Sequence, residues 1–427
     1  MRLEKQRQLF KNKQFTYLLG EQVLTQFSYS LVSFSSIITV FKLTKSNFSV
    51  GILLLCFYLP SIFTAMLAGM VSDHFHRKKI LTVTNIIWAS LVVVMAFTRN
   101  NYWLFLLITI LIQITDEFFQ NANAATIPMV VEEKNLISAN TLFSLTNYLC
   151  LIVGSISVGL LIRFFSPAAP FLTASLLVYL AAFIVSRLSF QQKIVMMPKN
   201  KEVIAHIKEQ IKQGWQFIRE SKMISLLVTF VASLTALQGL VMAISPGYVE
   251  NVLGIEASDA SFVFVLPLGI GLLSAGYFLG RFGKRFRKIE LIRKGMVLVG
   301  LGLLFLALIP KSSRVADFAK KTYHFESLLH TSLPLASVIL FLGFGGTLVF
   351  VPAYTSLQEN IPDQLRGRVL STATMLTQIA SALLILSSGF IADKIGFFPI
   401  LLTLSLAGLF FGLFSRKILV ETKVLEK

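Results

Sequence analysis

The residues best suited to chemistry lie within one long apolar segment, at about residues 102–130. Four polar residues recur there at helical spacing and so share one face of a helix: Gln113, Asp116, Gln120 and Asn123. Asp116 lies about 21 Å along the helix axis from the start of the segment. A carboxylate at such a depth in a bilayer costs roughly 2.5–3.5 kcal/mol on insertion scales, so it should face a cavity or a partner. A carboxyl that alternates between protonated and charged forms as access switches sides is what proton coupling requires. Asp116 is therefore a candidate for that role.

The adjacent carboxylate, Glu117, points about 100° away around the same helix and is a second proton-coupling candidate. For either acid alone, a structural hydrogen-bonded cluster between helices explains the residue about equally well. We favour a functional role for the pair.

A second polar stripe runs along the apolar segment at about residues 15–41. Gln22, Gln26 and Tyr29 are spaced to share one helix face. Together with Gln113, Gln120 and Asn123 they are the candidates for lining a substrate path. Two other acids are interpreted as surface groups. Glu21 is expected to be a carboxylate at the membrane surface, and Asp393 is expected to pair with Lys394.

The composition indicates what surrounds these residues. Of 427 residues, 55% are hydrophobic and 14% are charged, and the mean hydropathy is +0.73. Soluble domains are about 45–50% apolar and about 25% charged, so the soluble, disordered and disulfide-framework classes are excluded. The two cysteines, Cys56 and Cys150, are expected to be buried free thiols. The chain is therefore predicted to be a polytopic membrane protein.

Twelve segments are long and apolar enough to span a bilayer, which takes roughly 20 residues each. Six precede and six follow a polar stretch at 190–222. We predict an all-α membrane protein with two pseudo-symmetric six-helix bundles. The predicted spans are 15–41, 48–71, 79–98, 102–130, 138–163, 168–189, 223–245, 258–280, 290–310, 332–353, 367–391 and 397–414. The predicted domains are an N-terminal tail (1–14), a first bundle (15–189), a linker with an amphipathic helix (190–222), a second bundle (223–414) and a C-terminal tail (415–427).

The distribution of basic residues predicts the orientation. With both termini cytoplasmic, about 30 of the 39 lysines and arginines fall on the inner side. Much of the net charge of +18 is then a topology signal that also suits anionic lipid headgroups, and it does not indicate nucleic acid. We expect a multi-pass monomer in the plasma (inner) membrane.

The two halves repeat a loop motif. GMVSDHFHRKK, residues 69–79, closes the second span, and GYFLGRFGKR, residues 276–285, occupies the matching place in the second half. Two such halves in parallel are a common transporter design. The first motif resembles the G-x-x-x-D-x-x-G-R-K signature of the major facilitator superfamily, with His76 where the second glycine is usual. Further stretches resemble its macrolide-efflux and siderophore-exporter branch: QGWQFIRESKMISLL, LPLGIGLLSAGYFLGRFGKR and LRGRVLSTATMLTQI.

The resemblance implies the major facilitator fold, with transport by alternating access. It also implies a cytoplasmic latch between the halves that stabilises the outward-facing state. The residues that match such a latch are Gly69, Asp73, Arg77, Lys78, Arg366 and Arg368. The alternative is that the basic residues only anchor the loop on the inner side. We favour that alternative for Lys78 and the latch for Asp73 and Arg77.

An enzyme is not expected. All five histidines fall in predicted loops or the linker, and no H-E-x-x-H, G-x-S-x-G or phosphate-loop motif occurs, so neither metal nor cofactor is predicted. We predict a secondary active transporter, a proton-coupled antiporter that exports an amphipathic small molecule such as a drug, macrolide or siderophore. The alternatives are a lysophospholipid or lipid flippase on the same fold and, less favoured, a non-transporting membrane sensor or scaffold.

Overall fold

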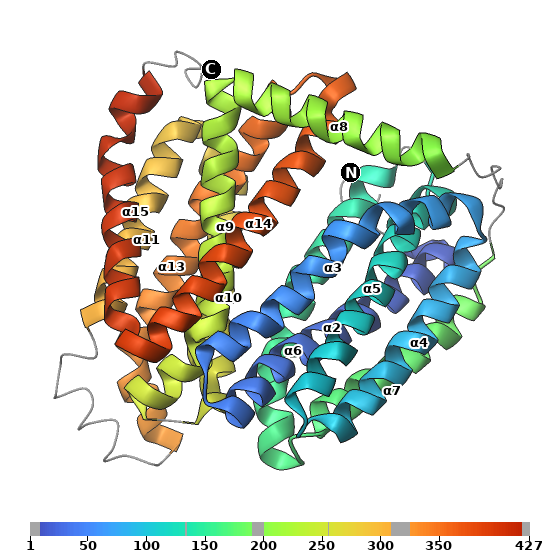
Figure 1. Cartoon of the computed structure of the whole chain (residues 1–427), viewed down its shortest axis with the longest axis horizontal. Coiled ribbons are helices and arrows are strands. Elements are labelled where there is room, and N and C mark those ends of the chain that lie inside the picture. The colour runs from blue at the N-terminus through green and yellow to red at the C-terminus, as the bar shows by residue number, and fades with distance from the viewer. Residues whose placement is uncertain (1–8, 133–134, 190–199, 255, 309–324, 421–427) are drawn as a thin grey trace. The chain divides into compact units, whose positions relative to one another are not determined.

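The computed structural model describes residues 9–132, 135–189, 200–254, 256–308 and 325–420, and every regular element among them is a helix (Figure 1). The helices of the first half and the linker are α2 (Lys13–Thr44), α3 (Asn47–His74), α4 (Arg77–Thr98), α5 (Tyr102–Val130), α6 (Leu136–Phe164), α7 (Ala169–Ser186) and α8 (Asn200–Glu220). Those of the second half are α9 (Lys222–Tyr248), η2 (Val249–Leu253), η3 (Ala257–Asp259), η4 (Ser261–Val265), α10 (Leu266–Phe282), η5 (Gly283–Arg285), α11 (Lys288–Leu308), α13 (Phe325–Asn360), α14 (Asp363–Ile395) and α15 (Phe397–Val420).

These helices confirm the predicted fold class. Among the described residues, ten helices are long and apolar enough to cross a membrane. Two shorter apolar stretches, Asn47–Ser61 and Phe397–Leu413, lie in α3 and α15. Each of the twelve predicted spans therefore corresponds to a helix.

The helices form two compact units. The first comprises residues Met1–Thr44 and Leu55–Pro198, and the second comprises Lys45–Leu54 and Lys199–Lys427. The start of α3 thus groups with the second unit, although the whole helix belongs to the first half of the sequence. The bundle boundaries drawn from the sequence stay a prediction.

In the first unit, α2 packs against α6 and α7, and α4 packs against α5 and α7. One apolar cluster joins the ends of α2, α4, α5 and α6 through Phe15, Leu18, Leu81, Phe119 and Phe143. Each of these side chains is nearly inaccessible to solvent, because it lies on the helix face turned toward its neighbours. This packing holds the polar stripes of α2 and α5 inside the unit.

In the second unit, α9 packs against α13 and α14, while α13 also packs against α10 and α11. The linker helix α8 lies on α14, where Gly214 approaches the Arg368 carbonyl and the Thr372 side chain. Ile218 on the same side of α8 is buried, and Trp215 is 49% exposed. The predicted amphipathic helix is therefore present and turns part of its apolar surface outward.

A small residue is required where α10 crosses α13. A Cβ atom at Gly271 would collide with the Leu340 carbonyl and lie 2.9 Å from the Phe344 backbone nitrogen. Backbone atoms cannot rotate away as a side chain can. The contact of α10 with α13 therefore depends on the missing side chain.

We expect Gly271→Ala to lower the unfolding free energy by about 1–3 kcal/mol, the usual cost of overpacking a core. Gly276→Ala, on the same helix, is the matched control, because a Cβ there meets nothing within 4 Å and alanine favours helix over glycine. The apparent melting temperature in detergent should fall for Gly271→Ala only. Equal melting temperatures for the two variants would contradict this account of the crossing.

Candidate functional site

The polar stripes of α2 and α5 meet inside the first unit. Gln22 is 3% exposed, and its side-chain amide donates to Asn147 Oδ1 of α6 at 2.7 Å. Its carbonyl oxygen accepts from the Asn123 amide of α5. One glutamine thus joins three helices by side-chain hydrogen bonds. Such bonds replace the water that a bilayer cannot supply.

A second contact joins the same two helices about two turns further along α2. The Gln113 amide donates to the Tyr29 hydroxyl at 3.3 Å. The structure thus brings Gln22 and Tyr29 of α2 against Asn123 and Gln113 of α5, and their role in transport stays a prediction. Gln26 is half-buried, and its side chain has no hydrogen-bond partner among the described residues.

Asp116 lines a small cavity that is enclosed by α2, α4, α5 and α7. The cavity has a volume of about 10 Å³, which is room for roughly one water molecule. Its polar lining includes Tyr29, Asn85 and Gln120, and the Gln120 amide lies 3.5 Å from Asp116 Oδ1. Asp116 therefore faces a cavity within the protein, as its depth in the helix requires.

The structure separates Glu117 from Asp116. Glu117 is half-buried but does not line this cavity. Its backbone carbonyl accepts the Asn121 side-chain amide at 2.8 Å. Of the two proton-coupling candidates, Asp116 is thus the one that the fold brings to a polar cavity.

Glu21 is a buried carboxylate that sequence reasoning misplaced. Its side chain is 0% exposed, so the expectation of a surface carboxylate is wrong. The Asn85 amide of α4 donates to Glu21 Oε1 at 3.3 Å, and Oε2 has no hydrogen-bond partner within the described part of the chain. Because Asn85 also lines the cavity that contains Asp116, it lies between two carboxyl groups.

The motif at the end of α3 is held within the first unit by Arg77. Its guanidinium donates to the Ser72 carbonyl at 3.1 Å and to the Ala125 carbonyl of α5 at 2.7 Å. The preceding residue, His76, has φ −60° and ψ 110°, ordinary extended backbone that any residue adopts. The turn therefore does not need the usual glycine.

The proposed latch is only partly visible. The side chains of Asp73 and Arg366 lie outside the described residues. Gly69 lies in α3, Lys78 is half-buried at the start of α4, and Arg368 donates to Gln213 of α8. The latch stays a prediction.

A carboxylate of the second unit binds the first turn of α3. The side-chain oxygens of Asp393 accept four hydrogen bonds, from the Ser46 hydroxyl (2.6 Å), the Asn47 side-chain amide (2.7 Å), the Asn47 backbone N–H (2.9 Å) and the Phe48 backbone N–H (3.0 Å). The expected pairing of Asp393 with Lys394 is thus replaced by an N-terminal cap, for which a carboxylate is well suited.

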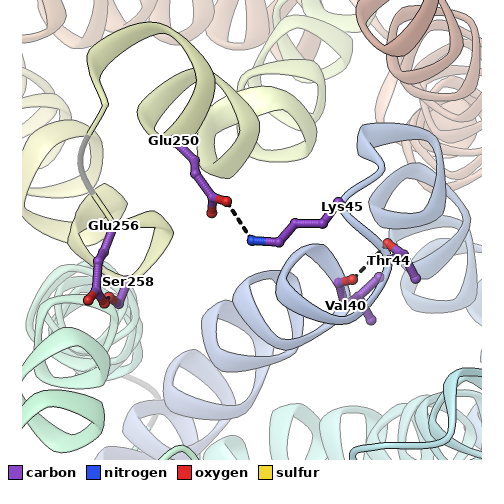
Figure 2. Close-up of polar contacts among 6 residues, drawn as sticks. All are labelled: Val40, Thr44, Lys45, Glu250, Glu256 and Ser258. Atoms are coloured by element: carbon purple, nitrogen blue, oxygen red, sulfur yellow. Dashed lines mark hydrogen bonds and ion pairs between the residues drawn. The ribbon is translucent and has the colours of Figure 1, made fainter.

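An ion pair lies beside this cap. Lys45 Nζ is 2.5 Å from Glu250 Oε1, as Figure 2 shows. Sequence reasoning missed these contacts. The available signal was Ser46-Asn47 before an apolar run, a typical helix start.

Comparison with known proteins identifies the family. Residues 22–385 match the family model described as Major Facilitator Superfamily. The chain belongs to the Major Facilitator Superfamily. It is therefore a multi-pass membrane transporter of small molecules and not an enzyme. Among the described residues, no group of three or more His, Cys, Asp or Glu side chains is placed to hold a metal ion.

Three curated relatives come from Bacillus subtilis. The transporter YjbB is 28% identical over 34% of this chain. The matched segment covers only 38% of the length of YjbB. YfiS is 23% identical over 91% of this chain and 89% of its own; both are described as uncharacterized transporters of the superfamily. "Putative bacilysin exporter BacE" is 23% identical over 86% of this chain and 85% of its own.

Solved transporter structures share the fold. A peptide transporter is 13% identical with a TM-score of 0.70, covering 97% of this chain and 96% of its own. The nucleoside transporter NupG is 12% identical with a TM-score of 0.66, covering 96% of this chain and 100% of its own. At these identities the likeness concerns the fold alone.

We expect Asp393→Asn to weaken the cap of α3, because each hydrogen bond to a charged group contributes about 1.5–3 kcal/mol. Hydrogen–deuterium exchange of peptides covering residues 45–54 should accelerate roughly tenfold or more. Lys394→Gln is the control, since it changes charge at the next position without touching these bonds. Unchanged exchange in Asp393→Asn, or equal acceleration in both variants, would show that the carboxylate does not hold this turn.

Proposed function

We propose that this chain is a proton-coupled antiporter that exports an amphipathic small molecule by alternating access. The observation that carries the proposal is the position of Asp116, a carboxyl on a polar cavity within a bundle of membrane-spanning helices. Proton coupling through the protein needs a group that gains and loses a proton between the two access states. An ionisable residue inside the membrane is the usual form of such a group.

The hydrogen-bond partners of Asp116, which is half-buried, and of Glu21, which is buried, suit this cycle. Gln120 approaches Asp116, and Asn85 contacts Glu21. A side-chain amide can donate to a carboxylate or, after rotation, accept from a carboxylic acid. Both protonation states therefore retain a hydrogen bond. An arginine or lysine partner would favour the charged state alone.

The substrate class rests on the chemistry of the interior. The candidate path residues of α2 and α5 (Gln22, Gln26, Tyr29, Gln113, Gln120 and Asn123) carry amide and phenol groups within largely apolar helices. Such a surface favours an uncharged or weakly charged molecule with scattered hydrogen-bonding groups, such as a drug, macrolide or siderophore-like compound. The relative described as a bacilysin exporter supports outward transport. The bias of lysine and arginine supports cytoplasmic termini.

The test measures transport in vesicles. A thermal-shift panel of macrolides, siderophores and peptide antibiotics first selects a ligand, because binding to the folded state raises its stability. An imposed pH gradient should then drive uptake of that ligand into inverted vesicles. Asp116→Asn should abolish the gradient-driven component because the residue can no longer exchange a proton. Ligand binding and exchange without a gradient should remain.

Glu117→Gln is the matched control, one residue away and outside the cavity, and its flux should stay close to that of the wild type. Glu21→Gln tests whether the second buried carboxyl shares the coupling. Unchanged gradient-dependent flux in Asp116→Asn combined with Glu117→Gln would remove these residues from the mechanism. If the wild-type protein transports the ligand at the same rate with and without the pH gradient, proton coupling itself would be overturned.

A further inference from the structure

An open groove lies where α4 begins and α7 ends. Its volume is about 610 Å³. Six of its lining residues are polar or basic: His76, Lys78, Lys79, Thr82, Ser186 and Ser189. Nothing in the mechanism of the first unit uses this groove, because the Asp116 cavity is lined by other residues.

The chemistry of the groove favours an anion. Lys78 and Lys79 pair with no carboxylate of the described residues, and the groove lining contains no Asp or Glu. The groove also meets the first turn of α4, whose N-cap residue, His76, makes no side-chain capping bond. Backbone N–H groups at such a helix start attract phosphate oxygens. Two lysines and a helix start together match a phosphate group.

An apolar wall continues from the groove along the same two helices. Val83 lines the groove itself and is 52% exposed, and Ile87 lies one turn further along α4 and is 45% exposed. On α7, Phe183 precedes Ser186 by three residues and is 58% exposed. The two faces are neighbours, because α4 and α7 lie side by side (Figure 1) and Ser90 Oγ is 2.7 Å from the Tyr179 hydroxyl.

The dimensions of this surface suit a lipid. Ile87 follows Lys79 by eight residues, which is about 12 Å along a helix at 1.5 Å per residue. Half of the hydrocarbon core of a bilayer is about 15 Å thick. A basic site for an anionic headgroup and an apolar strip comparable in length to one leaflet therefore lie next to each other along α4.

We propose that this groove binds the phosphate of an anionic phospholipid, whose acyl chain lies along α4 and α7. Lys78 and Lys79 supply the charge, and Val83, Ile87 and Phe183 supply the apolar contact. A free phosphate ion would use the same lysines but would gain nothing from the apolar wall. The apolar wall therefore favours a lipid over a free phosphate ion as the ligand.

The test is native mass spectrometry of the full-length protein in detergent, titrated with phosphatidylglycerol or phosphatidylcholine. The wild type should retain one tightly held phosphatidylglycerol and bind phosphatidylcholine weakly. Lys78→Gln with Lys79→Gln should weaken that binding by roughly tenfold to thirtyfold, as expected for removal of two lysines near an anionic lipid. The matched control is Arg281→Gln with Arg285→Gln, which removes two charges from the equivalent loop of the second half and should leave this binding unchanged.

Two further arms separate the lipid from a free anion. Val83→Ser with Ile87→Ser should weaken phosphatidylglycerol binding, and millimolar inorganic phosphate should not displace the lipid. Efficient displacement by phosphate, or no effect of the serine variants, would identify a simple anion site and overturn the proposal. Equal losses in the lysine pair and the arginine control would show that only net charge matters, which also overturns it.

Discussion

A polar side chain within a membrane-spanning helix must find its hydrogen-bond partner in the protein, because lipid offers none. This constraint organises the first unit. Gln22 bonds to α5 and α6, and Glu21, its neighbour, contacts α4 through Asn85. Adjacent residues of α2 therefore bind helices on different sides. The polar contacts fix which helix faces meet, while apolar packing of the kind formed by Phe15 and Leu18 supplies area but little direction.

The hydrogen-bond partners of a carboxylate determine whether it can take up a proton without losing its hydrogen bonds. Asp116 and Glu21 differ from Asp393 in this respect. Asp116 and Glu21 are approached by side-chain amides, which can rotate and serve either protonation state. Asp393 instead accepts from two backbone N–H groups, which can only donate. Protonation of Asp393 would therefore leave donors without acceptors at the start of α3. The same residue type is thus the proposed coupling group in one unit and a helix cap in the other.

Periodicity and hydropathy predicted what depends on one helix at a time. The spans follow from apolar length, and the polar stripe on each of α2 and α5 follows from helical spacing, whereas the bonds of Gln22 with Asn123 and of Tyr29 with Gln113 appear only in the structure. The predictions for Glu21 and Asp393 were wrong, because their surroundings depend on contacts between segments that are distant in the sequence. The sequence shows how far Glu21 lies from a helix end, but not that α4 covers it. Likewise, Asp393 and Ser46 are 347 residues apart, and nothing local links them.

The neighbouring basic residues Arg77, Lys78 and Lys79 of the signature loop make different contacts, and these match the chemistry of arginine and lysine. Arg77 turns inward, and its planar guanidinium donates to carbonyls at the ends of α3 and α5, which needs several directed N–H groups. Lys78 and Lys79 turn toward the groove, where a mobile point charge suits a headgroup that arrives in varied poses. One short run of cations therefore combines the packing of the helix ends with the proposed lipid contact. The inward bonds of Arg77 hold the start of α4 in place, and a fixed helix start presents its two lysines on the same side.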